Sequence, residues 1–218
     1  MKNSQKGFTL VEIAIVLVII GLLLGGILKG QEMITQAKIK NVIADITGVS
    51  AAMYGYQDRY RALPGDDKNA DRWTSGGGAK PGNGDGIIIG AYNATGATPP
   101  ESIQFWDHLR RAGFVGGSGA ENPFNAVSGK MGVQTGDGAG AGVLAVAGPA
   151  TEPFTGLIMC SANLPDKIAV SVDAQMDDGK GNSGSVRGIK AAGNADVKPI
   201  AETYTEDGVS TYLICRQM

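Results

Sequence analysis

The chain has 218 residues, a length that allows one large domain or two small ones. Its 34 glycines are roughly twice the usual share, but with 43% hydrophobic and 18% charged residues it is neither a disordered tail nor a collagen. The net charge of −2 argues against a general nucleic-acid binder. One histidine and two cysteines leave too few soft ligands for a structural zinc site.

The first thirty residues combine a short basic leader with an apolar run from Phe8 to Leu28. At about 1.5 Å a residue, this run spans about 30 Å, the thickness of a bilayer core. A secretory signal has a shorter apolar core, of about 7–15 residues. Lys2 and Lys6 precede the run and Lys29 follows it, so the positive-inside bias predicts that the leader stays in the cytoplasm. The bulk of the chain then faces outward.

Glu12 is the only ionisable side chain between Lys6 and Lys29. A carboxylate there costs about 2–3 kcal/mol or more unless it is neutralised, is paired or reaches the interface. A segment that serves only as a membrane anchor does not require a carboxylate at this position. Two interpretations stay open at this point: a carboxylate near the membrane surface without a specific partner, or a functional group of the helix.

Residues 7–12, with the sequence GFTLVE, resemble the processing site of type IV pilins and pseudopilins. The resemblance covers Lys6 to Leu28 and implies a membrane peptidase that cuts after Gly7 and methylates the new amino terminus, Phe8. It also implies that Glu12 acts in assembly by pairing with Phe8 of a neighbouring subunit. In a low dielectric the two charges compensate one another, whereas either alone is strongly disfavoured.

For the whole protein, this resemblance implies a structural subunit of a type IV pilus filament on the bacterial surface. The expected partners are further copies of the chain in a helical filament, other pilins, the prepilin peptidase and the pilus assembly platform. The precursor is expected in the inner membrane and the assembled subunit at the cell surface. Two alternatives stay open. One is a minor pilin or a pseudopilin of a type II secretion system, and the other is a membrane-anchored extracellular binding or hydrolytic domain.

Four glycines in and after the apolar run have spacings that allow helices to approach closely in an apolar setting. They are Gly21, Gly25, Gly26 and Gly30. Each also weakens a helix by up to about 1 kcal/mol relative to alanine. Close packing and local melting are therefore both open, and the resemblance implies that a stretch of this helix can lose order on assembly.

An amphipathic helix continues the apolar run. Its apolar residues recur at alternating spacings of three and four, which is one continuous helical stripe. They are Ile39, Val42, Ile46, Val49, Met53, Tyr56 and Tyr60. We therefore expect one helix of about 50 residues, from Phe8 to near Arg61, that is ended by Pro64 and Gly65.

Residues 63–142 are rich in glycine and turn formers, and one short helix is expected within them, over residues 101–112. Its apolar side chains gather on one side, and Gly113 is a stop signal. His108 lies between charged neighbours with no identifiable catalytic partner. We therefore expect it at the surface or rim of the domain.

Short β-branched runs between turn formers predict an antiparallel sheet within residues 143–218. The expected strands are Val143–Ala147, Leu157–Cys160, Ile168–Val172, Val186–Ile189 and Val209–Cys215. A helix with an apolar stripe and a sheet with one apolar face make a two-layer α+β domain. This arrangement resembles the type IV pilin fold, in which one long amino-terminal helix packs on an antiparallel sheet.

The expected organisation of the chain has five segments. They are a leader at 1–7, a transmembrane and assembly helix at 8–30, its amphipathic half at 31–62, the connecting region at 63–142, and the sheet with a disulfide loop at 143–218.

Cys160 and Cys215 each end a predicted strand in a domain expected to face an oxidising compartment. An even cysteine count there usually indicates a bridge, with two buried thiols or a redox pair as the alternatives. A bridge between them closes a loop of about 56 residues and contributes about 4 kcal/mol in the chain-entropy model. This loop resembles the carboxyl-terminal disulfide region of type IV pilins.

Two loops carry carboxylates that could bind calcium: Asp85 lies in one, and Asp177 and Asp178 lie in the other. Neither has the full ligand set of an EF-hand, and Asx-rich turns form without metal. We therefore expect structural turns, with calcium as the alternative and no other cofactor. The sequence has no P-loop, H-E-x-x-H or G-x-S-x-G motif, so no enzymatic activity is expected. Scattered basic residues predict no specific nucleic-acid partner.

Overall fold

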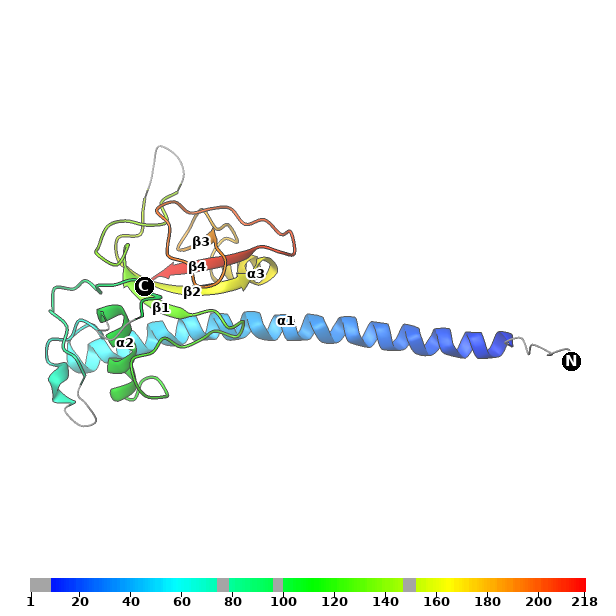
Figure 1. Ribbon diagram of the computed structural model, residues 1–218, viewed down its shortest axis with the longest axis horizontal. Coiled ribbons are helices and arrows are strands. Elements are labelled where there is room, and N and C mark those ends of the chain that lie inside the picture. Colours follow the sequence, from blue (N-terminus) through cyan, green and yellow to red (C-terminus); the bar gives the residue numbers. More distant parts are fainter. Residues whose placement is uncertain (1–8, 74–78, 96–99, 147–151) are drawn as a thin grey trace, which may run out of the picture. The chain divides into compact units, whose positions relative to one another are not determined.

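The computed structural model describes residues 9–73, 79–95, 100–146 and 152–218 (Figure 1). The elements in chain order are α1 (Leu10–Tyr60), a short 3-10 helix η1 (Ala70–Arg72), α2 (Glu101–Arg111), β1 (Met131–Thr135), β2 (Leu157–Pro165), α3 (Asp166–Met176), β3 (Val186–Lys190) and β4 (Thr211–Gln217). The chain divides into two compact units, Met1–Ala37 and Lys38–Met218. Helix α1 contributes residues to both units, which are described separately below.

In the second unit, α1 contributes an apolar stripe to the core. The sequence predicted this stripe from apolar residues spaced alternately three and four apart. Six of the seven predicted stripe residues are buried: Ile39, Val42, Ile46, Val49, Met53 and Tyr56. The seventh, Tyr60, is half-buried at the end of the helix. Arg61 then takes a left-handed backbone conformation with φ of 54°, and its N–H donates to the carbonyl of Gln57 at 2.8 Å. This geometry closes the last turn and ends the helix where the sequence predicted.

The four strands form one antiparallel sheet in the order β1-β2-β4-β3. Because successive side chains of a strand point to opposite faces, β2 and β4 supply both sides of the sheet. In β4, Tyr212 and Ile214 join one hydrophobic cluster, and Leu213 and Cys215 join the other. The register of β2 shifts between Ser161 and Leu164, which is a bulge in this otherwise regular pairing.

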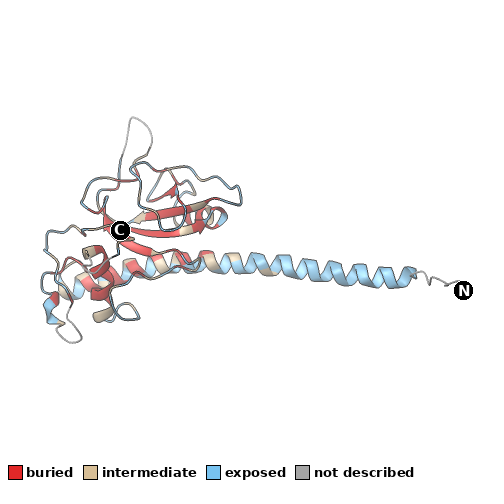
Figure 2. Cartoon of the chain, in the orientation of Figure 1, coloured by how far each residue is buried: buried red, intermediate tan, exposed pale blue. Residues whose placement is uncertain are grey.

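Both faces of the sheet are covered, so the expectation of a single apolar face was incomplete. Side chains of α1, α2 and α3 form a core on one face. On the other face, a second cluster includes Val143, Leu144, Phe154 and Ala201, which belong to irregular segments rather than to a helix. The strands are accordingly buried along most of their length (Figure 2). The architecture is the expected α+β, type IV pilin-like fold with a disulfide-closed carboxyl-terminal region.

The predicted strand Ile168–Val172 is wrong, because these residues lie in helix α3. Pro165 precedes this helix and Asp166 is its first residue, where a carboxylate favours the helix start. The buried residues Ile168, Ala169 and Val172 share one helical face. A five-residue apolar run is compatible with either element, and the start signals at residues 165 and 166 decide in favour of the helix.

Two further differences concern strands. Strand β1 was not predicted, because Gly132 interrupts its short apolar alternation within a glycine-rich region. Within Val143–Ala147, Val143 makes only an isolated bridge with Phe154, and Ala147 lies outside the described residues. Leu144 has a φ of 52°, which is incompatible with a regular strand at this position.

Neighbouring segments cover both edge strands of the sheet. At β1, the N–H of Thr135 donates to the carbonyl of Ile88 at 3.3 Å, and Tyr92 donates to the side chain of Gln134 at 2.9 Å. At β3, Gly188 donates to the carbonyl of Gly181 at 2.7 Å. Covered edges prevent another chain from adding a strand. An assembly of this protein therefore has to use a different surface.

Candidate processing and assembly site

The start of α1 is built as a capping box. Thr9 lies directly before the helix, and its N–H and hydroxyl both donate to Glu12 Oε2, each at 2.8 Å. The N–H of Glu12 donates in return to Thr9 Oγ1 at 3.3 Å. These bonds satisfy backbone groups that have no partner in the first turn of a helix. The capping box was not predicted, although the T-x-x-E spacing before an apolar run is its signature.

Glu12 is therefore placed at the positive end of the helix dipole, where a carboxylate is stabilised. Gly7 and Phe8, the predicted cleavage and methylation residues, lie outside the described residues. Thr9 is the first described residue and follows the predicted methylation residue, Phe8, in the sequence. Its two hydrogen bonds hold Glu12 close to this end of the helix.

The apolar run that follows is solvent-exposed in the first unit (Figure 2). Its large side chains range from 47% exposed at Ile20 to 86% at Leu10. Within the described chain, α1 is the one helix long and apolar enough to cross a membrane. Exposed apolar area is unfavourable by about 25 cal/mol per Å² in water. This segment therefore requires a bilayer or other protein chains around it.

The four glycines of this segment make no close contact within the described chain. A Cβ atom added at any of them would meet no atom within 4 Å, outside the backbone of the same helical turns. They are Gly21, Gly25, Gly26 and Gly30. If these residues serve close helix packing, the second helix has to come from another chain. Lys29 and Glu32 form an exposed ion pair at 2.7 Å that marks the end of the apolar run.

The predicted bridge between Cys160 and Cys215 is confirmed. The two residues are directly opposite each other on β2 and β4 and are fully buried in the second hydrophobic cluster. The bond thus closes a segment that contains α3 and β3. It joins two central strands of the sheet inside the domain.

The carboxylates considered for calcium accept hydrogen bonds that shape their own loops. Asp177 accepts from Ser185 N and Val186 N, at 2.5 and 3.1 Å. Asp178 accepts from Lys180 N at 2.9 Å and Ser183 Oγ at 2.6 Å. Their carboxylates lie close to that of buried Asp173, with ligand atoms of the three within 4.8 Å of one another.

Asp85 likewise closes a local turn, because it accepts from Asn83 Nδ2 at 2.7 Å and from Ile87 N at 2.8 Å. These bonds account for both acidic loops as turns of the kind that Asx residues form. Calcium binding to either loop stays a prediction.

His108 is fully buried, so its expected place at the surface or rim was wrong. Helix α2 is buried nearly all round, and the charged neighbours of His108 are themselves paired: Asp107 contacts Arg111 at 2.7 Å. His108 Nδ1 accepts from Gly65 N at 2.9 Å, and Nε2 lies 2.9 Å from the carbonyl oxygen of Lys80. With Nε2 as the donor, the neutral ring satisfies both contacts, and burial lowers its pKa.

The described part of the chain thus supplies a capped helix start, an exposed apolar segment and a separate folded domain. The family described as the prokaryotic N-terminal methylation motif matches residues 2–28. A search of curated proteins found no match. The chain therefore carries the prepilin motif of type IV pilins and pseudopilins, whose members are structural proteins. The motif and the apolar helix fit a membrane-anchored precursor that is processed and assembled with other pilins.

Proposed function

We propose that this protein is the structural subunit of a type IV pilus filament, processed after Gly7 and assembled through the exposed apolar part of α1. The observation that carries the proposal is the position of Glu12, the one carboxylate in an apolar surface that has no cover within the described chain. The match of the methylation motif to residues 2–28 includes this position and the predicted cleavage site.

The geometry at Glu12 supports an intermolecular charge pair. Both hydrogen bonds from Thr9 go to Oε2, which leaves Oε1 to accept from the ammonium group of Phe8 in a neighbouring subunit. Cleavage after Gly7 creates that ammonium group. In the apolar interior of a filament each charge is costly alone, so only one axial register of the two helices satisfies both.

The Cys160–Cys215 disulfide favours a pilus subunit over a pseudopilin, because the segment it closes resembles the carboxyl-terminal disulfide region of type IV pilins. Filaments seen on the cell surface would support this choice. Filaments confined to the cell envelope, together with a loss of protein secretion when the chain is deleted, would instead indicate the pseudopilin.

The test compares filament yield in the native cell for the wild type, Glu12→Gln and Glu32→Gln. Glu32 is the matched control, because it is an exposed carboxylate of the same helix just beyond the apolar run. We expect a processed Glu12→Gln chain, with methylated Phe8 by mass spectrometry and amino-terminal sequencing, but few or no filaments. Glu32→Gln should assemble normally. Wild-type filament yield from Glu12→Gln would contradict the charge-pair mechanism, and an intact Met1 in the mature protein would contradict processing.

A further inference from the structure

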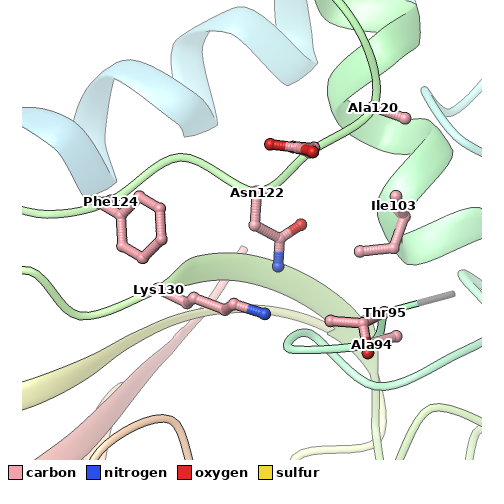
Figure 3. A pocket seen from close by; sticks show the side chains of 8 residues that line it. Ala94, Thr95, Ile103, Ala120, Asn122, Phe124 and Lys130 are labelled. Carbon is pink, nitrogen blue, oxygen red and sulfur yellow. The ribbon is translucent and has the colours of Figure 1, made fainter.

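A pocket of about 380 Å³ lies in the second unit, far along the chain from the assembly segment (Figure 3). Its walls come from three places: the segment before α2, Ile103 of α2, and the stretch that leads into β1. The side chains that line it include Thr95, Ile103, Glu121, Asn122, Phe124 and Lys130. Its volume is within the usual range of small-molecule sites.

Hydrogen bonds hold the walls of this pocket in place. Arg110 Nη1 donates to the carbonyl oxygens of Gly119 and Glu121, each at 2.7 Å, and so fixes the segment after α2. Asn122 Nδ2 donates to the carbonyl of Tyr92 and joins two walls. The pocket is therefore formed before any ligand enters, and a ligand does not have to order these segments on binding.

Polar groups in the pocket retain hydrogen-bonding capacity. Asn122 Oδ1 is buried and has no hydrogen-bond partner among the described residues. Lys130 Nζ makes one long hydrogen bond, 3.4 Å to the carbonyl of Asn93, and it forms no ion pair within the described chain. Glu121 adds a carboxylate to the same pocket. Because Asn122 Oδ1 is closed off from solvent, the groups within reach of a ligand are the ammonium group of Lys130 and the carboxylate of Glu121, and a ligand that both donates and accepts hydrogen bonds matches this pair.

The pocket also has an apolar side. Phe124 is 64% exposed and its ring stands at the edge of the pocket, while Ile103 lines the opposite wall (Figure 3). An exposed aromatic ring beside convergent polar groups suits a ligand with one apolar face. A purely anionic ligand would be repelled by Glu121, and a purely apolar one would leave Lys130 and Glu121 desolvated without partners.

We propose that this pocket binds a neutral hexopyranose, as a free sugar or as the terminal unit of a glycan. A pyranose ring has a C–H face that can pack on Phe124, and its hydroxyl groups can donate to Glu121 and accept from Lys130. The pocket has room for one or two such rings. This inference is independent of filament assembly, because it concerns the second unit alone and is tested on unassembled protein.

The test uses the full-length chain in micelles of a zwitterionic or amine-oxide detergent, since maltoside detergents are themselves glycosides. The probes are the methyl glycosides of glucose, galactose and N-acetylglucosamine, with sodium acetate and glycine as ionic comparisons. Saturation-transfer NMR should show transfer to the ring protons of at least one glycoside, with a dissociation constant in the millimolar range. Neither acetate nor glycine should displace it.

Two variants probe the pocket, and one serves as a control. Phe124→Ala removes the exposed ring and Lys130→Met removes the ammonium group, and each should weaken binding about tenfold. Tyr54→Ala, which removes a 56% exposed aromatic ring from α1, should bind like the wild type. Unchanged thermal unfolding would show that the variants fold. Absence of transfer from all three glycosides, equal transfer in wild type and Phe124→Ala, or displacement by acetate or glycine would each overturn the proposal.

Discussion

Buried polar residues connect the loops around α2 to the end of α1, and His108 is central among them. Its ring joins Gly65 to the segment at Lys80, and it stacks on Tyr56 with ring centroids 6.3 Å apart. Tyr56 in turn donates to buried Asp67 at 2.7 Å. A second proton on His108 would bring an N–H against the N–H of Gly65, so protonation of this ring works against the native structure.

We predict that the free energy of unfolding falls as the pH is lowered from about 7 to 5 because of His108. Burial lowers the pKa of His108 in the native state and outweighs the contact with the Lys80 carbonyl and the charges of Asp67 and Asp107, which raise this pKa, while Arg72 lowers it further. Over this range the unfolded chain, whose histidine has a pKa of about 6.5, binds more protons at this position than the folded chain does. Stability is therefore fully present above the unfolded pKa and is lost as the pH falls toward the folded pKa.

His108→Gln is the test variant, because glutamine keeps one donor and one acceptor but does not titrate. Urea unfolding at a series of pH values should show a smaller loss of stability between pH 7 and 5 in the variant than in the wild type. An identical pH dependence of the two chains would contradict the role given to His108.

Thr9 is expected to stabilise the first turn of α1. Thr9→Val removes the hydroxyl that bonds Glu12 and should destabilise the helix start by about 1 kcal/mol, as for other N-cap replacements. Amide hydrogen exchange at Glu12 and Ile13, whose N–H groups bond to Thr9, should then be about fivefold faster in micelles. Thr9→Ser keeps the hydroxyl and should exchange at the wild-type rate. Equal protection in Thr9→Val would show that the capping box contributes nothing to the helix start.

At the scale of elements, long periodic signals were predictable from the sequence, and short ones were predictable only in part. Helix α2 and strands β2, β3 and β4 overlap the helix and strands that the sequence predicted. Helix α1 and the burial of Ile39 to Tyr56 follow from a 3,4 spacing repeated over several turns. Helix α3 and strand β1 are short, and their apolar runs are compatible with either helix or strand. The residues that cover the second cluster, such as Val143, Leu144 and Phe154, follow no period, and only the tertiary structure places them.

The same distinction applies to the candidate site. The roles in cleavage, methylation and assembly could be proposed for Gly7, Phe8 and Glu12, because the motif fixes their spacing within a few residues of sequence. The burial of His108 could not, because it depends on contacts with Gly65 and Lys80, far away along the chain.

Gly25 offers a test of the exposed helical segment. Gly25→Ala adds a methyl group that meets no atom within 4 Å in the described chain, and alanine strengthens a helix by up to about 1 kcal/mol. The subunit should therefore fold normally. In the filament, the methyl group separates neighbouring helices and opposes local melting, so the yield should fall about fivefold.

Gly48→Ala is the matched control, since Gly48 lies in the same helix and is also without close contacts. Its filament yield should equal that of the wild type. Filament yields for Gly25→Ala at the wild-type level would contradict any requirement for glycine at this position.

At the scale of the whole molecule, the folded core of the second unit does not depend on the apolar segment. The α1 residues in that core begin at Ile39, beyond the last residue of the first unit, Ala37. We predict that a chain lacking residues 1–30 is a water-soluble monomer with cooperative unfolding. Size-exclusion chromatography with light scattering, and circular dichroism on heating, would measure this. A non-cooperative transition would show that the core extends into the removed segment, and oligomers would show that the second unit associates through its own surface.

Non-covalent contacts of Arg187 hold the irregular segments that cover the second cluster against the sheet. Arg187 on β3 donates through Nη1 to the carbonyl oxygens of Leu144 and Glu152, at 2.9 and 2.5 Å. Its guanidinium group also lies over the ring of Phe154, 4.3 Å from the centroid. The Cys160–Cys215 disulfide is buried in this same cluster, and among the described residues that form the cluster none belongs to a helix, so the bond supports a region covered by irregular segments.

The disulfide should therefore be a major contributor to the stability of the domain. In the chain-entropy model, a bond between residues 55 apart restricts the unfolded chain by about 4 kcal/mol. A Cys160→Ala/Cys215→Ala chain should lose a large part of this stability in urea unfolding and show a larger m-value, because its unfolded state is less compact. The native wild type should resist mild reductant, since both sulfur-bearing residues are fully buried. Rapid reduction without unfolding, or equal stability of the alanine variant, would show instead that the paired strands β2 and β4 hold this cluster together without the bond.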